Sequence, residues 1–247
     1  MAWILDLDGV VWLGDEPVPG SAEAIARLRD RGERVVFVSN NSSARVGEYL
    51  TKLAGVGVPA TAADLITSGQ AAASLVEPGQ TALVCGGPGV DEALVARGAR
   101  TVRAGDADAV VVGWHRDFDY ERLTAAATAV LNGARLIGTN DDPTYPTPAG
   151  PIPGGGAILA AVATAAGVEP VVAGKPHQPI VDLVTARLGD ALRGSTLVGD
   201  RPSTDGLMAK ALGVQFALVL SGVTSADDLP VEPTPAQVVS DLAALVR

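Results

Sequence analysis

Short apolar runs alternate with amphipathic segments along this chain, and the alternation predicts an α/β fold with a mostly parallel sheet. Residues 3–5 and 35–38 are two such runs, each apolar throughout as in a short buried strand. The segment after the second run has apolar residues at the i, i+3, i+4, i+7 spacing of one helix face, namely Val46, Tyr49, Leu50 and Leu53.

Polar residues at the ends of these segments predict where the helices begin. The expected starts are Ser21, Ser42 or Ser43, Pro179, Ser203 and the pair Thr234-Pro235. Glycines that follow several of the segments are expected to end the helices. The helix from Ser203 should turn Leu207, Ala211 and Leu212 towards the core, and the last helix should continue through Val246.

Four of the apolar runs lead into polar residues that suit phosphoryl chemistry. The runs are residues 3–5, 35–38, 171–172 and 196–198. The polar residues after them are Asp6 and Asp8, then Ser39 with Asn40 and Asn41, then Lys175, and finally Asp200. If the four runs are parallel strands of one sheet, their polar ends meet at the edge where open α/β folds bind ligands. Together these groups could hold a metal ion and a phosphate.

The interval between Ser39 and Lys175 is far longer than one strand-helix unit needs. It contains strand candidates at 83–84, 110–112 and 136–137 and helix candidates at 119–131 and 157–166. We therefore expect an inserted second domain over residues 79–173, with the core domain formed by residues 1–78 and 174–247.

Composition and charge exclude several kinds of partner. The 247 residues have a formal net charge of -10 and no basic run, so a nucleic acid polymer is not an expected partner. The apolar stretch 157–168 is well short of the about 20 residues of a membrane span, and no signal peptide is evident. Cys85 is the single cysteine, which excludes an intrachain disulfide and fits a reducing compartment. We expect a cytoplasmic protein without membrane contact.

Hydrolysis of a phosphate monoester needs a nucleophile, a proton donor for the leaving oxygen and positive charge around the phosphoryl group. Asp6 is placed to attack and form an aspartyl-phosphate. Asp8 could act first as general acid and then as general base towards water. Mg²⁺ prefers oxygen ligands, which predicts a metal site at Asp6, Asp200 and the backbone carbonyl of Asp8.

Phosphate binding is expected from two further segments. Ser39 with the amides of Asn40 and Asn41 lies at a predicted strand-to-helix turn, where helix N-termini bind anions. Lys175 would supply a point charge to the phosphate and the nucleophile. Asp205 could orient metal-bound waters or pair with Lys175. Arg201 is expected to have a local structural role.

Four motifs of this chain resemble, in order, those of the haloacid dehalogenase (HAD) superfamily. They are Asp-Leu-Asp-Gly-Val, Val-Ser-Asn-Asn-Ser, Ala-Gly-Lys-Pro and Val-Gly-Asp-Arg-Pro-Ser-Thr-Asp. The insertion between the second and third motifs is similar to the cap of class IIA members, the NagD-type and p-nitrophenyl-phosphatase-like enzymes. The resemblance covers nearly the whole chain. It departs at Gly206, where related sequences usually carry a larger aliphatic residue.

The resemblance implies a Rossmann-like parallel-sheet core with a smaller inserted α/β cap. It also implies a Mg²⁺-dependent phosphatase in which Asp6 is the nucleophile, Asp8 the acid/base, and Ser39 and Lys175 bind phosphate. Candidate substrates are nucleoside monophosphates, glycerol phosphate, phosphoglycolate and pyridoxal phosphate, with p-nitrophenyl phosphate as an artificial one. Related enzymes often pair through their caps, so a homodimer is possible. Substrate contacts in the cap are expected around 140–148 and 154–156.

Other functions remain as alternatives at this point. A phospho-acceptor signalling protein also uses Asp, Ser or Thr, Lys and Mg²⁺ on a parallel sheet, although Asp-x-Asp-Gly and the long insertion argue against it. A phosphomutase or a dehalogenase on the same framework is a second alternative, and Asp8 argues against the dehalogenase. A binding module without catalysis is a third. His177 is a candidate for the edge of the site, and the Cys85-Gly-Gly-Pro-Gly segment fits neither a cysteine phosphatase loop nor a dinucleotide motif.

Overall fold

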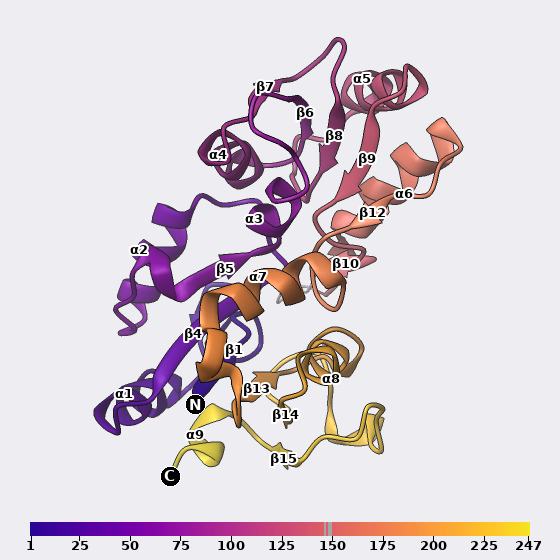
Figure 1. The fold of residues 1–247 in the computed structure, drawn as a ribbon. Coiled ribbons are helices and arrows are strands. Elements are labelled where there is room, and N and C mark those ends of the chain that lie inside the picture. Colours follow the sequence, from indigo (N-terminus) through magenta and orange to yellow (C-terminus); the bar gives the residue numbers. More distant parts are fainter. Residues whose placement is uncertain (146, 148–149) are drawn as a thin grey trace.

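Two parallel β-sheets organise the molecule, one in the core and one in the inserted cap (Figure 1). The computed structural model describes residues 1–145, 147 and 150–247. The core strands are β1 (Ala2–Leu5), β4 (Arg34–Ser39), β5 (Leu65–Thr67), β13 (Thr196–Gly199), β14 (Gln215–Val219) and β15 (Gln237–Val239). They are ordered β15-β14-β13-β1-β4-β5, and each neighbouring pair is parallel.

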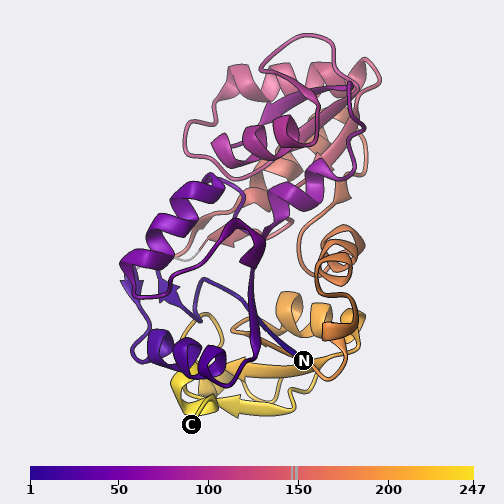
Figure 2. The ribbon, with the colours of Figure 1, turned by 60° about the vertical axis from the view of Figure 1, so that its left-hand side comes forward.

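The cap sheet is also entirely parallel, in the order β12-β9-β8-β6-β7. Its strands are β6 (Thr81–Cys85), β7 (Arg100–Val102), β8 (Ala109–Val112), β9 (Arg135–Gly138) and β12 (Val171–Val172). The two sheets confirm the expected α/β class with an inserted α/β domain. The limits of that domain, residues 79–173, remain a prediction. Both chain ends lie in the core, and the cap lies on one side of it (Figure 2).

Helices cover both faces of the core sheet, as a parallel sheet requires. In the described part of the chain the helices are α1 (Ser21–Asp30), α2 (Val46–Gly55), α3 (Ser68–Ala73), α4 (Pro88–Ala96), α5 (Tyr120–Leu131), α6 (Gly155–Ala166), α7 (Gln178–Leu188), α8 (Leu207–Leu212) and α9 (Leu242–Leu245). Alternate residues of β4 point to opposite faces. Phe37 packs with α1 and α2, whereas Val36 packs with α3, α7 and α8.

The cap and the core share one hydrophobic cluster. Ile4 of the core sheet and Val84 of the cap sheet belong to the same buried group, which is continuous through α3, α4 and α7. The opposite face of the cap sheet packs separately against α5 and α6. Apolar packing therefore helps to set the position of the cap. No helix in the described residues combines the length and the apolar character needed to cross a membrane.

One of the four expected core strands lies in the other sheet. The run 171–172 forms β12, which pairs with β9 of the cap and not with the core. The run is only two residues long, and its partner was not evident from the apolar pattern. Lys175 therefore follows the last cap strand, and the expectation that it ends a core strand is wrong.

The C-terminal helix expected from Thr234 is also wrong. Residues Gln237–Val239 form β15 at the edge of the core sheet, and only the short helix α9 follows, with Asp241 as its N-cap. The β-branched pair Val238-Val239 pairs with β14, so sheet hydrogen bonding overrides the apolar spacing that suggested a helix.

Two other helix predictions need correction. The N-caps of α1 and α2 are Gly20 and Arg45, and the expected cap Ser21 instead donates to the carbonyl of Val10 at 2.8 Å. A π-helical turn, Pro202–Gly206, precedes α8. Leu212 is buried as expected, but Leu207 and Ala211 are exposed and Met208 is buried, because the wider turn changes the face that the helix presents to the core.

Candidate active site

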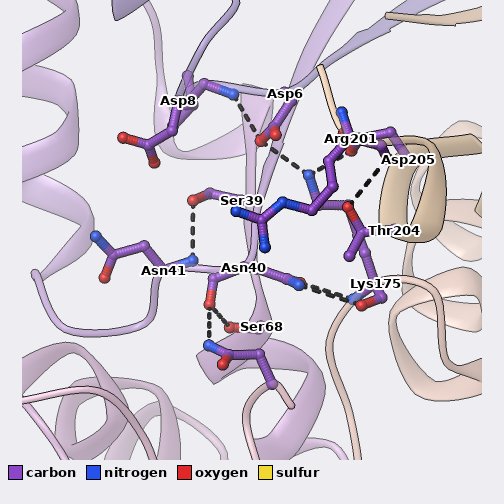
Figure 3. Close-up of polar contacts among 12 residues, drawn as sticks. Asp6, Asp8, Ser39, Asn40, Asn41, Ser68, Lys175, Arg201, Thr204 and Asp205 are labelled. Atoms are coloured by element: carbon purple, nitrogen blue, oxygen red, sulfur yellow. Dashed lines mark hydrogen bonds and ion pairs between the residues drawn. The ribbon is translucent and has the colours of Figure 1, made fainter. Parts of the chain in front are cut away.

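Asp6 and Lys175 form the centre of the site (Figure 3). Asp6 follows β1 directly, and its Oδ1 accepts a hydrogen bond from the Leu7 N–H at 2.8 Å. The same oxygen lies 2.8 Å from Lys175 Nζ, which also donates to Asp205 Oδ1 at 2.7 Å. Burial opposes the charge of Lys175, but the Asp205 and Asp6 carboxylates outweigh it and raise the lysine pKa.

The backbone of Lys175 is held in place by Asn40. The Asn40 Oδ1 accepts from the Lys175 N–H at 2.7 Å, and its Nδ2 donates to the Lys175 carbonyl at 3.1 Å. Gly174 is needed here because a Cβ would lie 2.4 Å from the Thr139 carbonyl oxygen. These contacts bring the lysine to the core site from the end of the cap.

Three carboxylates meet beside this lysine. One oxygen each of Asp6, Asp200 and Asp205 lies within 4.8 Å of the others. Burial raises the pKa of Asp6 well above its ordinary value, and Lys175 offsets only part of that effect. Burial, followed by the nearby Asp205 carboxylate, raises the pKa of Asp200 to about 6. The positive charge of one lysine cannot balance three carboxylates. The oxygen atoms of these carboxylates are the ligands that a hard divalent cation such as Mg²⁺ prefers.

Asp200 and Asp205 are held by different contacts. Asp200 Oδ2 accepts from the Val223 N–H at 2.6 Å, and a Cβ on Gly9 or Gly222 would lie within 2.3 Å of that oxygen. Asp205 has both oxygens engaged, Oδ1 by Lys175 and Oδ2 by the Arg201 N–H at 3.1 Å. This supports a positioning role for Asp205.

The departure at Gly206 from related sequences has a structural counterpart. A Cβ on Gly206 would lie 2.8 Å from Cγ of Pro233, and 3.0 Å from the Phe216 ring. The space that a larger residue would occupy is thus filled by Pro233. The helix that carries Asp205 is packed without a side chain at position 206.

Asp8 lies on the side of the site that faces the cap. Its Oδ1 accepts from the Trp12 indole N–H at 3.1 Å, and the Tyr145 hydroxyl oxygen is 3.5 Å away. Burial raises the Asp8 pKa, and the Lys52 ammonium is the largest effect in the opposite direction.

Ser39 ends β4, and the segment from Asn40 to Ser43 forms a loop rather than a helix start. Ser39 is buried, and its Oγ accepts from the Asn41 N–H at 3.1 Å. The sequence suggested that the amides of Asn40 and Asn41 lie at a helix N-terminus. They do not, because α2 begins only at Val46. The Asn40 side chain is engaged with Lys175 and the cap, so any phosphate contact from it would come from its backbone.

The cap supplies residues that were not individually expected. Trp114 and Tyr145 stack with ring centroids 4.8 Å apart. Asp142 accepts from Asn40 Nδ2 at 2.9 Å and pairs with Arg201 at 3.0 Å, which gives Arg201 a role beyond local structure. Trp114 had no recognisable signal in the sequence, whereas Asp142 and Tyr145 lie in the expected contact stretch 140–148. Pro146 and Pro148 of that stretch lie outside the described residues.

These side chains enclose a small cavity with a volume of about 70 Å³. Gly154 and Gly155 at the start of α6 also line it, and substrate contact at 154–156 stays a prediction. Among the described residues, His177 is not one of those that line the cavity. Its Nε2 lies 2.8 Å from Asp141 Oδ2 of the cap. Core and cap together therefore form one polar, partly aromatic cavity around Asp6.

Comparison with known proteins places this fold and site in a family. Residues 3–100 match the haloacid dehalogenase-like hydrolase family, and residues 172–245 match the HAD-hydrolase-like family. The chain belongs to the haloacid dehalogenase-like hydrolases. Within them, the α/β cap inserted between the second and third motifs places it in the class IIA, NagD-like branch.

Similar proteins cover nearly the whole chain. A D-glycerol 3-phosphate phosphatase of Mycobacterium tuberculosis is 38% identical over 98% of this chain and 70% of that protein. A 5′-nucleotidase of Bacillus subtilis is 33% identical over 92% of this chain and 90% of that protein. The crystal structure of a glycerol phosphate phosphatase from Mycobacterium tuberculosis in complex with magnesium covers 100% of this chain and 76% of the other, with a TM-score of 0.91 and 36% identity.

Proposed function

We propose that this protein is a Mg²⁺-dependent phosphatase that hydrolyses small phosphate monoesters through an aspartyl-phosphate. The observation that carries the proposal is the meeting of Asp6, Asp8, Lys175 and Asp200 in one small cavity. The similarity to phosphatases over nearly the whole chain supports the reaction class.

The residues divide the chemistry between them. The Asp6 carboxylate attacks phosphorus while the bond from phosphorus to the ester oxygen breaks, and Asp8 gives its proton to the leaving oxygen. Asp8 then accepts a proton from the water that attacks the aspartyl-phosphate, which releases phosphate and restores Asp6. Lys175 neutralises charge on the phosphoryl group and on Asp6. Asp205 holds the lysine in position.

Three groups form the proposed metal site: the Asp6 and Asp200 carboxylates and the Asp8 backbone carbonyl. A Mg²⁺ ion bound there supplies positive charge to the phosphoryl oxygens. The magnesium in the related glycerol phosphate phosphatase supports this choice of cation. Ser39 and the backbone amides of Asn40 and Asn41 are the proposed phosphate-binding groups on the opposite side.

The charge of the cavity favours a neutral leaving group. The acidic side chains Asp8 and Asp142 line the same cavity, which argues against the carboxylate of phosphoglycolate. Glycerol phosphate, the substrate in the name of one relative, has such a leaving group and is the first candidate. Trp114 and Tyr145 would contact the leaving group.

A phosphate-release screen over glycerol 3-phosphate, nucleoside monophosphates, phosphoglycolate, pyridoxal phosphate and p-nitrophenyl phosphate tests the proposal. We expect release only with Mg²⁺, highest turnover with glycerol 3-phosphate among the metabolites, and loss of at least about a thousandfold in Asp6→Asn. The exposed Asp106→Asn serves as a matched control, with turnover unchanged. Wild-type turnover in Asp6→Asn would overturn the nucleophile assignment.

Labelling with acetyl phosphate tests one of the alternatives. A phospho-acceptor signalling protein would be labelled once by acetyl phosphate without continuous phosphate release.

The expected cytoplasmic location is supported by the single buried Cys85. Pairing of two copies through the cap stays a prediction, and sedimentation equilibrium would detect it.

A further inference from the structure

A single indole donates a hydrogen bond to the proposed acid/base. Trp12 lies in the hairpin of β2 (Trp12–Leu13) and β3 (Glu16–Pro17), a few residues after Asp8. Its Nε1–H donates to Asp8 Oδ1 at 3.1 Å, and only 1% of the Trp12 side chain is exposed. This contact lies inside the usual range for N–H···O hydrogen bonds.

Trp12 is itself held from two directions. Its carbonyl accepts from the Gly9 N–H at 2.6 Å, which closes the turn that carries Asp8. On the other side, Lys52 Nζ lies 4.5 Å from the indole centroid, within the range of a cation–π contact. Lys52 also donates to the Gly14 carbonyl at 2.6 Å, which ties it to the same hairpin. The indole therefore has little freedom to rotate away from Asp8.

The other polar group beside Asp8 is less suited to hold it. The Tyr145 hydroxyl is 3.5 Å from Asp8 Oδ1, longer than the usual O–H···O distance. A hydroxyl can also both donate and accept, whereas an indole N–H can only donate. In the described part of the chain, Trp12 thus makes the shortest hydrogen bond to this carboxylate.

We propose that Trp12 is a positioning residue that determines which oxygen of Asp8 carries the proton. Because the indole can only donate, Oδ1 accepts its hydrogen bond, and this disfavours the proton on Oδ1, since a protonated oxygen is a weak acceptor. The proton of Asp8 is then on Oδ2, the oxygen free to face the ester oxygen of the substrate. The inference rests on the proposed phosphatase function and adds a residue to it.

The consequence depends on the leaving group. An alkoxide such as that of glycerol is strongly basic and needs a proton as the ester bond breaks, whereas p-nitrophenolate leaves without one. The ratio kcat/KM covers the steps up to departure of the leaving group. For Trp12→Phe we expect kcat/KM to fall by about tenfold to a hundredfold with glycerol 3-phosphate, or with the alkyl ester that the wild type cleaves best. With p-nitrophenyl phosphate it should stay within about threefold.

Trp3→Phe is the matched control, since Trp3 lies on β1 and donates its indole N–H to Glu33 on the core. Trp3→Phe also removes an indole N–H, and it should not lower kcat/KM for the alkyl ester relative to kcat/KM for p-nitrophenyl phosphate. A second variant replaces Trp12 with 3-benzothienylalanine, which keeps the bicyclic ring and has sulfur in place of N–H. It should show the same selective loss as Trp12→Phe and so separates the hydrogen bond from packing, even if Trp12→Phe folds poorly.

The role of Trp12 and the proposed phosphatase function would be overturned by different results. Equal losses with the alkyl and p-nitrophenyl esters in the 3-benzothienylalanine variant, or no loss with either, would overturn the positioning role of Trp12. Absence of Mg²⁺-dependent phosphate release from every ester in the wild type would instead overturn the proposed function.

Discussion

Replacing Asp200 with asparagine should stabilise the protein when no divalent cation is present. Asp200 is only 4% exposed, and burial followed by the Asp205 carboxylate raises its pKa from 3.8 to about 6. A carboxyl group with a higher pKa in the folded chain holds its proton more tightly there than in the unfolded chain. Between roughly pH 4 and pH 6 the folded state therefore binds more protons, and the free energy of unfolding falls as the pH rises.

The size of the effect follows from the shift. About two pKa units correspond to about 3 kcal/mol of lost stability once the pH exceeds the folded-state pKa. Asparagine has nearly the same shape without the charge, and its side-chain oxygen can still accept from the Val223 N–H. Asp200→Asn should therefore be more stable than the wild type by up to about 3 kcal/mol at pH 7.5, and equally stable near pH 4.

Urea unfolding with EDTA at pH 4, 5.5 and 7.5 measures this difference. Asp106→Asn, an exposed change of the same kind, should show no pH-dependent gain. Added Mg²⁺ should stabilise the wild type at pH 7.5 more than the variant, because the cation binds the folded carboxylate cluster. A variant that is no more stable at pH 7.5, or whose gain is the same at every pH, would refute the reasoning.

Two further substitutions test the lysine and the cap. Lys175→Met should abolish phosphate release. It should also lower the free energy of unfolding by about 3–5 kcal/mol at neutral pH without metal, because Asp6 and Asp205 then stay buried without their counter-charge. A free energy of urea unfolding near the wild-type value would contradict this. Asp142→Ala removes the contacts of the cap with Arg201 and Asn40 and should raise KM severalfold in steady-state kinetics. Asp117→Ala, which breaks an ion pair within the cap, should leave KM unchanged, and equal effects of the two would count against a cap-to-core role for Asp142.

Much of the site could be predicted because its residues lie close to one another in the sequence or directly after strands. Asp6 and Asp8 follow a strand whose apolar pattern is plain, and Asp200 follows β13 in the same way. Parallel strands bring such ends to one edge of a sheet, so their convergence follows from the pattern alone. Lys175 was expected at the site as the end of a core strand; it lies at the site, although the strand before it belongs to the cap sheet.

Trp12, Trp114 and Asp142 could not be assigned in this way. The Trp12 indole reaches Asp8 only because the hairpin folds back on the strand end. Asp142 meets Asn40 across more than a hundred residues of chain, and no local pattern encodes that contact. The strand β15 shows the same limit, since its pairing with β14 outweighs the helical spacing of its own residues.

The sequence by itself determined the α/β class, the inserted domain and the acids at the strand ends. Period-two and period-3.6 patterns are local, and motifs keep their chemistry wherever the chain places them. Only the tertiary structure decided which sheet each short strand joins, how Lys175 bridges Asp6 and Asp205, and which cap residues close the cavity. Those outcomes depend on long-range packing and on buried charges that stabilise one another only after the chain has folded.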